Sequence, residues 1–294
     1  MKALTTLLIA LLYSFICAAQ KDKVYSSLEE ALKNPADVFV LSLSNKKLAQ
    51  LPETIIQFPN LTSLDLSGNK LTELPLSITQ LTNLVELDLS DNKFNTLPEI
   101  VTRLTSLTEL DFSSNNCSVL PNSLSALSRL RILYLNNNKF TQLPDAVLKL
   151  AGLSELYLYG NLLSSLPENI GKLSKLTELG LGGNMLYALP ESISQLTQLR
   201  YLTLPYNLFV NFPETITRLP NLIVLDLNRN KLTAIPSTIN RLTVLKELYI
   251  EGNKLSNLPE SLTELSDLTT INIRENNSLK LSPALKKFIE DKKI

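Results

Sequence analysis

The chain has 294 residues, with 28 basic and 28 acidic side chains, and 44% of its residues are hydrophobic. This composition predicts a globular protein with a sizeable core, and the even charge balance lacks the basic excess that nucleic-acid binding usually requires. There is no histidine or tryptophan, and the only cysteines are Cys17 and Cys117, which excludes histidine-based catalytic triads and the usual zinc ligand sets.

The first 19 residues have the pattern of an export signal. Lys2 supplies a positive charge, Leu4 to Ile16 form an apolar run of 13 residues, and Cys17 to Ala19 are small residues suited to cleavage. The run is shorter than the roughly 20 residues of a membrane span. We therefore expect a signal peptide at 1–19, no integral membrane span, and a protein that is secreted or held in the cell envelope. The bulky Ile16 disfavours the alternative of a lipid anchor at Cys17.

Residues 20–37 are expected to cap the amino-terminal end of the fold. Ser26 to Lys33 indicates a short helix that begins at a serine and ends before Pro35.

Residues 38–281 are built from internal repeats, which are the dominant signal in the sequence. Ten asparagines follow one another at intervals of 23 residues: Asn69, Asn92, Asn115, Asn138, Asn161, Asn184, Asn207, Asn230, Asn253 and Asn276. Ten prolines, from Pro52 to Pro259, repeat with the same period. Lys46 occupies the asparagine position of one further unit, so we expect eleven units, the first of them atypical.

The unit Leu61 to Asn83 shows the pattern of a single repeat. Leu64 and Leu66 alternate with Asp65, which indicates a strand with its leucines inward and its carboxylate outward. The asparagine three residues later carries two N–H donors and an acceptor, so it is predicted to satisfy backbone groups in a turn that stacking buries. Pro75 then begins a return segment suited to a turn of α or 3₁₀ helix.

This unit resembles the leucine-rich repeat pattern LxxLxLxxNxLxxLPxxIxxL over about 245 of the 294 residues. The 23-residue form with a Leu-Pro step is similar to bacterial exported leucine-rich repeat proteins and to Ras-group signalling scaffolds. The resemblance implies an α/β repeat solenoid, a horseshoe with a parallel sheet on its concave face and short helical or 3₁₀ segments on its convex face. One unit cannot bury its apolar side chains alone, so the units are expected to fold as one stack.

The last segment, 282–294, is expected to be a carboxy-terminal capping helix. Ser282 and Pro283 open it, and Leu285, Phe288 and Ile289 fall on one side.

Function in such an array is expected on the strand positions that the repeat leaves variable. The predicted partner-binding residues are Tyr134, Tyr157, Tyr159, Tyr201, Tyr249, Glu86, Asp88, Glu109, Asp111, Glu155 and Glu178. Gly180 and Gly182 are expected to leave a dip among the tyrosines. Carboxylates on this face far outnumber the single basic residue expected there, Arg274, which favours a basic or mixed protein partner and no nucleic acid.

Other interpretations of the same residues stay open. The tyrosines and carboxylates could serve only to keep an exposed sheet soluble and ordered. A divalent cation at Asp65, Asp88 and Asp111 would need closer convergence than a flat ladder offers. Five lysines that follow the repeat asparagines are interpreted as a solvated row along one edge: Lys70, Lys93, Lys139, Lys231 and Lys254.

The sequence therefore predicts a monomeric, non-enzymatic protein-recognition scaffold without a cofactor or a metal. Two alternatives come from other classes. One is the targeting arm of an effector enzyme, which is disfavoured because about a dozen residues follow the last unit and none is a cysteine. The other is an intracellular scaffold similar to the Ras-group proteins.

Overall fold

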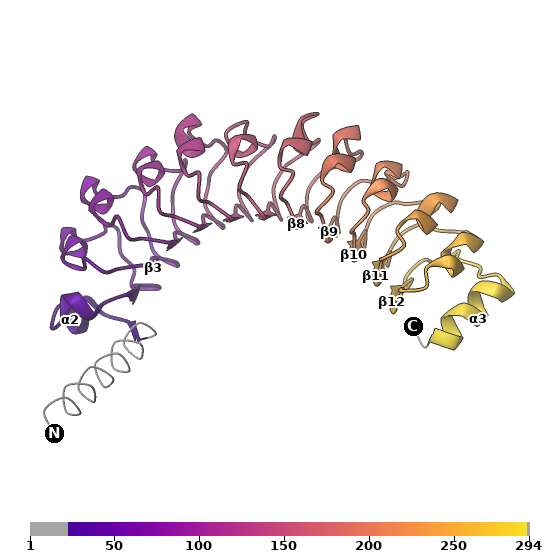
Figure 1. Ribbon diagram of the computed structural model, residues 1–294, viewed down its shortest axis with the longest axis horizontal. Coiled ribbons are helices and arrows are strands. Elements are labelled where there is room, and N and C mark those ends of the chain that lie inside the picture. The colour runs from indigo at the N-terminus through magenta and orange to yellow at the C-terminus, as the bar shows by residue number, and fades with distance from the viewer. Residues whose placement is uncertain (1–22, 293–294) are drawn as a thin grey trace, which may run out of the picture.

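The computed structural model describes residues 23–292, and the expected signal peptide at 1–19, with Cys17, lies outside them. Within the described part, twelve parallel strands pair in chain order to form one open sheet. The chain coils into an arc with the strands along its inner side and the helical segments along its outer side (Figure 1). The predicted horseshoe is thus confirmed.

Each turn of the coil contributes a short strand and a short helix. The strands are β1 (Val24–Tyr25), β2 (Val40–Ser42), β3 (Ser63–Asp65), β4 (Glu86–Asp88), β5 (Glu109–Asp111), β6 (Ile132–Tyr134), β7 (Glu155–Tyr157), β8 (Glu178–Gly180), β9 (Tyr201–Thr203), β10 (Val224–Asp226), β11 (Glu247–Tyr249) and β12 (Thr270–Asn272). The 3₁₀ helices are η1 (Pro35–Asp37), η2 (Glu53–Gln57), η3 (Leu76–Gln80), η4 (Glu99–Arg103), η5 (Asn122–Ala126), η6 (Val147–Lys149), η7 (Ile170–Lys172), η8 (Glu191–Gln195), η9 (Glu214–Arg218), η10 (Ser237–Arg241) and η11 (Glu260–Glu264). The α-helices are α2 (Leu28–Ala31) and α3 (Pro283–Lys292).

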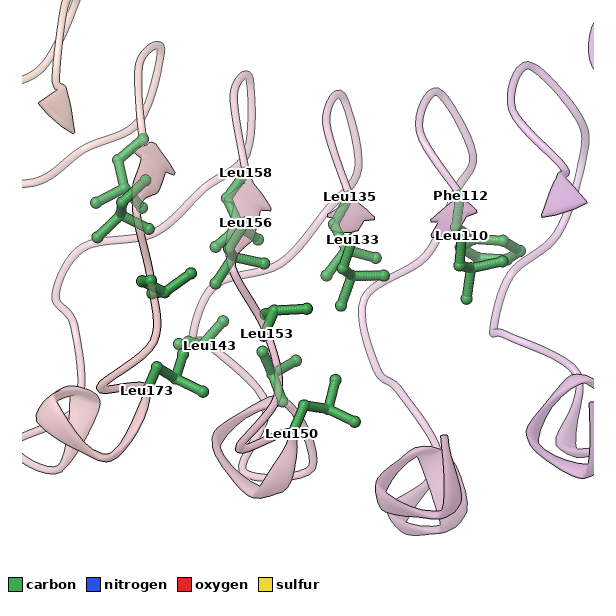
Figure 2. Packing of buried hydrophobic residues seen from close by; sticks show 14 of the residues in the cluster. Leu110, Phe112, Leu133, Leu135, Leu143, Leu150, Leu153, Leu156, Leu158 and Leu173 are labelled. Carbon is green, nitrogen blue, oxygen red and sulfur yellow. The ribbon is translucent and has the colours of Figure 1, made fainter. Parts of the chain in front are cut away.

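The repeat period sets the register of the sheet. From β2 to β12, each residue pairs with the residue 23 positions later, as in Leu64 with Leu87 and Leu87 with Leu110. Because the middle residue of each strand points inward, leucines of successive units stack behind the sheet. Leu133 and Leu135 of one unit pack beside Leu156 and Leu158 of the next (Figure 2), and all four are fully buried.

The prolines of the Leu-Pro step begin most of the outer helices. In eight of the described units a proline directly precedes the 3₁₀ helix, with a φ between −59° and −72°. The proline carbonyl accepts the N–H three residues later, as in the 3.1 Å bond from Ile78 to Pro75. Proline fits here because its fixed φ suits the first turn and its missing N–H has no partner to lose.

The repeat asparagines hold successive units together. Asn161 is 4% exposed, and its Nδ2 donates to the carbonyl oxygens of Leu135 and Leu158 at 2.9 and 3.0 Å. Its Oδ1 accepts the N–H of Phe140 in the preceding unit at 3.1 Å. The same donor and acceptor pattern recurs at Asn92 and Asn230. In the atypical first unit, the backbone N–H of Lys46 donates to Oδ1 of Asn69. The backbone N–H and C=O groups of the buried turns therefore have hydrogen-bond partners along the whole arc.

Both ends of the stack are covered. At the amino-terminal end, Ser27 caps α2 by accepting the N–H of Glu30, and β1 adds a two-residue strand that the sequence pattern did not indicate. At the other end α3 buries Leu285 completely, and Nζ of Lys292 donates to the Leu268 carbonyl at 3.0 Å. Among residues 23–292, no helix is long and apolar enough to cross a membrane.

Candidate partner-binding face

The concave face is formed by the first and third residues of each strand. In β4 the middle residue Leu87 is 1% exposed, while Glu86 is exposed and Asp88 is partly exposed. Parallel pairing places Glu86 beside Glu109 and Asp88 beside Asp111 on the next strand. The predicted binding residues of β4 and β5 therefore form two adjacent rows of carboxylates.

The aspartates at the third strand position are bound to their own backbone. Oδ1 of Asp88 accepts the N–H of Ser90 at 2.8 Å, and Oδ1 of Asp111 accepts the N–H of Ser113 at 2.7 Å. Asp65 and Asp226 make the same bond to the N–H two residues later. These aspartates close the turn after the strand, so part of the predicted acidic site has a structural task.

The glutamates at the first strand position lie on the open side of this surface. Partial burial, together with the charges of Glu86 and Asp111, raises the pKa of Glu109. A cation placed here would relieve the repulsion among these carboxylates. Glutamates therefore carry the acidic character that a partner can meet, more than the aspartates do.

Two of the predicted tyrosines form a stacked pair. The rings of Tyr134 and Tyr157 lie 4.8 Å apart between centroids, with an interplanar angle of 7°. The Tyr157 hydroxyl donates to Oε2 of Glu155 at 2.9 Å. Burial raises the pKa of both hydroxyls, and the neighbouring glutamates raise it further. Both phenols are therefore neutral at physiological pH and present a flat aromatic surface next to carboxylates.

The expected dip at the two glycines is filled by tyrosine. A Cβ on Gly182 would lie 2.7 Å from the ring of Tyr159 and 2.9 Å from Cγ of Pro205, and a Cβ on Gly180 would lie 3.0 Å from the ring of Tyr157. Both glycines are buried. The tyrosine rings pack directly over these glycines, because only a residue without a side chain leaves room for a ring lying across the strand.

The remaining tyrosines are placed differently. Tyr159 is 45% exposed and Tyr201 is 36% exposed. Tyr201 is paired with Glu178 on the neighbouring strand. Tyr249 lies on β11, four strands from Tyr157, which is roughly 19 Å at the spacing of a sheet. Its hydroxyl donates to Glu247 at 2.7 Å, and this bond, followed by burial, raises its pKa to about 12. Tyr249 is therefore outside the central group.

Two residues that make contacts on this face, Arg229 and Asn136, were not predicted from the sequence. Arg229 forms ion pairs with Glu251 at 2.8 Å and with Glu275 at 2.5 Å, so Arg274 is not alone in opposing the carboxylates. Asn136 accepts the backbone N–H of Tyr159 at 2.8 Å. Arg229 has a φ of 55° in the turn after β10, where the alternating strand pattern no longer tells which way a side chain points.

The described residues contain no group of three or more acidic or cysteine side chains that could hold a metal ion. The aspartates considered for a cation, Asp65, Asp88 and Asp111, each give an oxygen to a backbone N–H instead.

Family models for leucine-rich repeats match most of the chain. A leucine-rich repeat region matches residues 30–122 and 188–290, and a second leucine-rich repeat model matches 128–186 and 151–209. The chain belongs to the leucine-rich repeat family. No curated protein matches it in sequence.

Solved structures of several leucine-rich repeat proteins are similar. A leucine-rich repeat protein of Leptospira interrogans is 28% identical, with a TM-score of 0.50, covering 92% of this chain and 98% of its own. The Arabidopsis receptor kinase HAESA, in complex with the peptide hormone IDA and a co-receptor, is 28% identical with a TM-score of 0.66, over 79% of this chain and 45% of its own. TLR13 in complex with ssRNA13 is 29% identical with a TM-score of 0.72, over 82% of this chain and 37% of its own. This chain spans less than half the length of the last two.

Proposed function

We propose that this protein is an exported, non-enzymatic recognition scaffold that binds a protein partner through its concave face. The fold supports this because it presents one rigid, continuous surface made of strands. Family membership supports it as well, since a similar structure holds a peptide hormone. Export rests on the sequence pattern of residues 1–19.

The stacked pair of Tyr134 and Tyr157 is the observation that carries the proposal. A solvated sheet does not need two large rings stacked at 4.8 Å, because the third strand position holds a small or polar residue in every other strand from β2 to β12 except β11. Partly exposed aromatic rings that are held rigid lose little conformational entropy on binding, which makes tyrosine a frequent interface anchor. These residues define the centre of the proposed binding surface.

The flanking charges indicate the chemistry of the partner. Glu109, Glu155 and Glu178 surround the pair, and the charges of all three add to burial in raising the pKa of Tyr134. A basic or mixed protein surface complements them. The similar TLR13 structure contains single-stranded RNA, but a phosphate backbone would meet carboxylates here, and this favours a protein partner.

The proposal is tested with residues 20–294 and a triple variant, Tyr134→Ala, Tyr157→Ala and Tyr201→Ala. Partners captured from the producing cell's envelope or its surroundings are identified, purified and titrated against both proteins. We expect the triple variant to bind at least about tenfold more weakly, with an unchanged circular dichroism spectrum. Leu76→Ala is the matched control, because it removes an apolar side chain that is 66% exposed at the first residue of η3, on the convex side. Equal binding by the triple variant would show that the concave face is not the binding surface.

Charge reversal at Glu86 and Glu109 tests the nature of the partner without touching the aspartates that close the turns. For a basic partner, both substitutions to lysine should weaken binding and flatten its dependence on salt. A partner that binds the reversed protein equally well at all salt concentrations would contradict the electrostatic part of the proposal.

A further inference from the structure

A second row of variable residues lies outside the concave face. It consists of the residues that directly follow the repeat asparagines, along the edge beyond the carboxyl ends of the strands. Five of the ten are exposed lysines, but three successive units carry Leu162, Met185 and Leu208 instead, with exposures of 43%, 42% and 38%. The edge therefore changes from charged to apolar in the middle of the arc.

Backbone hydrogen bonds fix these side chains in a regular line. The N–H of Leu162 donates to the Phe140 carbonyl at 2.9 Å, that of Met185 to Leu163 at 2.9 Å, and that of Leu208 to Leu186 at 2.8 Å. The same ladder continues to Lys139 on one side and Lys231 on the other. Three apolar side chains on consecutive rungs are thus bordered by one lysine at each end.

Neighbouring residues widen the apolar surface. Tyr187 and Val210, two positions further along their units, are 65% and 48% exposed. Tyr206 is 56% exposed and has a φ of 55°, a conformation that most other units give to glycine, asparagine, aspartate or serine. A bulky residue in the left-handed region costs free energy, so its presence here is not explained by the fold. We call Leu162, Met185, Leu208, Tyr187, Val210 and Tyr206 the apolar strip.

We propose that the apolar strip is a second docking surface, which binds a protein segment that has apolar side chains at its centre and carboxylates at both ends. A contiguous exposed apolar surface with a polar border is typical of an interaction site. Lys139 and Lys231 are four repeats apart, roughly 20 Å at the spacing of a sheet. An extended segment of about six residues covers this distance, so both of its ends can reach a lysine.

The lysines at the two ends of the apolar strip favour this protein segment over a second copy of the chain. Any two-fold pairing of the strip with itself places lysine opposite lysine at both ends, whether the two rows run parallel or antiparallel. That arrangement is repulsive, whereas carboxylates in the partner would be attracted.

The carboxylates along the same edge disfavour a lipid surface. The same edge carries the exposed carboxylates Glu73, Asp91 and Glu275, which an anionic bilayer would repel.

The test compares the wild type with the strip variant Leu162→Lys, Met185→Lys and Leu208→Lys. Lysine occupies this rung in five other units, so the variant is expected to fold, and its melting curve checks this. Random peptides of about 12 residues, long enough to cover the strip, are displayed on phage and selected on the wild type. We expect enriched peptides with an apolar centre and acidic ends, and binding to the strip variant weakened by about tenfold or more.

Two further variants separate this surface from the concave face. Lys139→Glu with Lys231→Glu should weaken the same peptides, and Tyr134→Ala with Tyr157→Ala should leave them bound. Enrichment of peptides that bind the strip variant equally well, or that have basic ends, would overturn the proposal. Strip-dependent self-association in sedimentation, or strip-dependent binding to phosphatidylglycerol-containing vesicles, would assign the surface to a second copy or to lipid instead.

Discussion

Strands β3–β5 and strands β6–β9 share one backbone but use its third strand position differently. In β4 and β5 that position is aspartate, which accepts the N–H two residues later. In β7 it is Tyr157, and the N–H of Tyr159 turns instead to Asn136 of the preceding unit. In β9 the residue two positions on is Pro205, which has no N–H to satisfy. A position becomes free for recognition where another residue satisfies the turn.

The same arrangement occurs a second time. Tyr249 stands at the third position of β11, and the N–H of Glu251 donates to Asn228 of the preceding unit at 2.7 Å. An asparagine two residues after one strand thus accompanies a tyrosine on the next. In these two units the asparagine replaces aspartate as the acceptor for the turn, so Tyr157 and Tyr249 can occupy the third strand position. Tyr134 does not follow this correlation, because Ser113 stands at the corresponding place in the preceding unit.

The largest expected effect concerns the asparagine ladder that both regions share. Asn161→Ala leaves the Phe140 N–H buried without its acceptor and removes the shorter of two hydrogen bonds to the Leu135 carbonyl, so we expect a loss of roughly 1–3 kcal/mol in the free energy of unfolding. Urea denaturation measures it. Asn83→Ala is the control, because Asn83 makes an exposed bond to Pro59 and should change stability by less than about 0.5 kcal/mol. Equal losses in the two variants would show that the ladder does not hold the units together.

An intermediate effect tests the two ways of satisfying the turn. Asp88→Ala in the acidic region and Asn136→Ala in the tyrosine region should each cost about 1 kcal/mol, because each removes the acceptor of one backbone N–H. Glu86→Ala should cost much less, since Glu86 is exposed. Thermal and urea unfolding of the three variants give the comparison. If Asn136→Ala left the stability unchanged while Asp88→Ala lowered it, the inference that Asn136 replaces aspartate as the acceptor would be wrong.

The smallest effect is a dependence on pH in the acidic region. Burial is the largest cause of the raised pKa values of Asp88 and Glu109, and neighbouring carboxylates add to it. Their charged forms therefore disfavour folding, so stability should rise as pH falls through the folded pKa values toward the ordinary 3.8 and 4.5. We expect a gain of less than about 0.5 kcal/mol, because solvent screens these partly exposed groups.

The carboxylate of Asp65 has the opposite effect on the pH dependence of stability, and it acts in a different pH range. Burial acts to raise its pKa, but hydrogen bonds donated by Ser67 and Ser42 outweigh burial and hold the pKa below 3.8. Its stabilisation is lost only as pH falls below that value. Melting temperatures between pH 7 and 4 therefore report the raised groups, and Asp88→Asn with Glu109→Gln should flatten the curve. An unchanged curve in this double variant would exclude these two carboxylates as its source.

The regular repeat made the fold predictable, but it did not predict the details of the concave face. The spacing of the asparagines and the alternation around Leu64 specify strands, register and the inward side chains. Alternation says which face a residue occupies, but not how its side chain lies on that face. For this reason the sequence pattern did not predict that the ring of Tyr159 fills the dip expected at the glycines. Contacts from turns escaped it too, since Arg229 and Asn136 follow their strands and act on a neighbouring unit.

The dependence of each unit on its predecessor restricts how the length of this protein can change. An inserted or deleted segment of 23 residues rejoins equivalent positions, and every asparagine again meets the carbonyl it needs. A change of another length within a strand or the turn after it moves the leucines of that unit to the wrong side of the sheet or away from their turn. Whole turns are therefore the units in which this molecule can be lengthened, shortened or shuffled without disturbing its strands, and each exchanged turn brings its own pair of surface residues next to new neighbours.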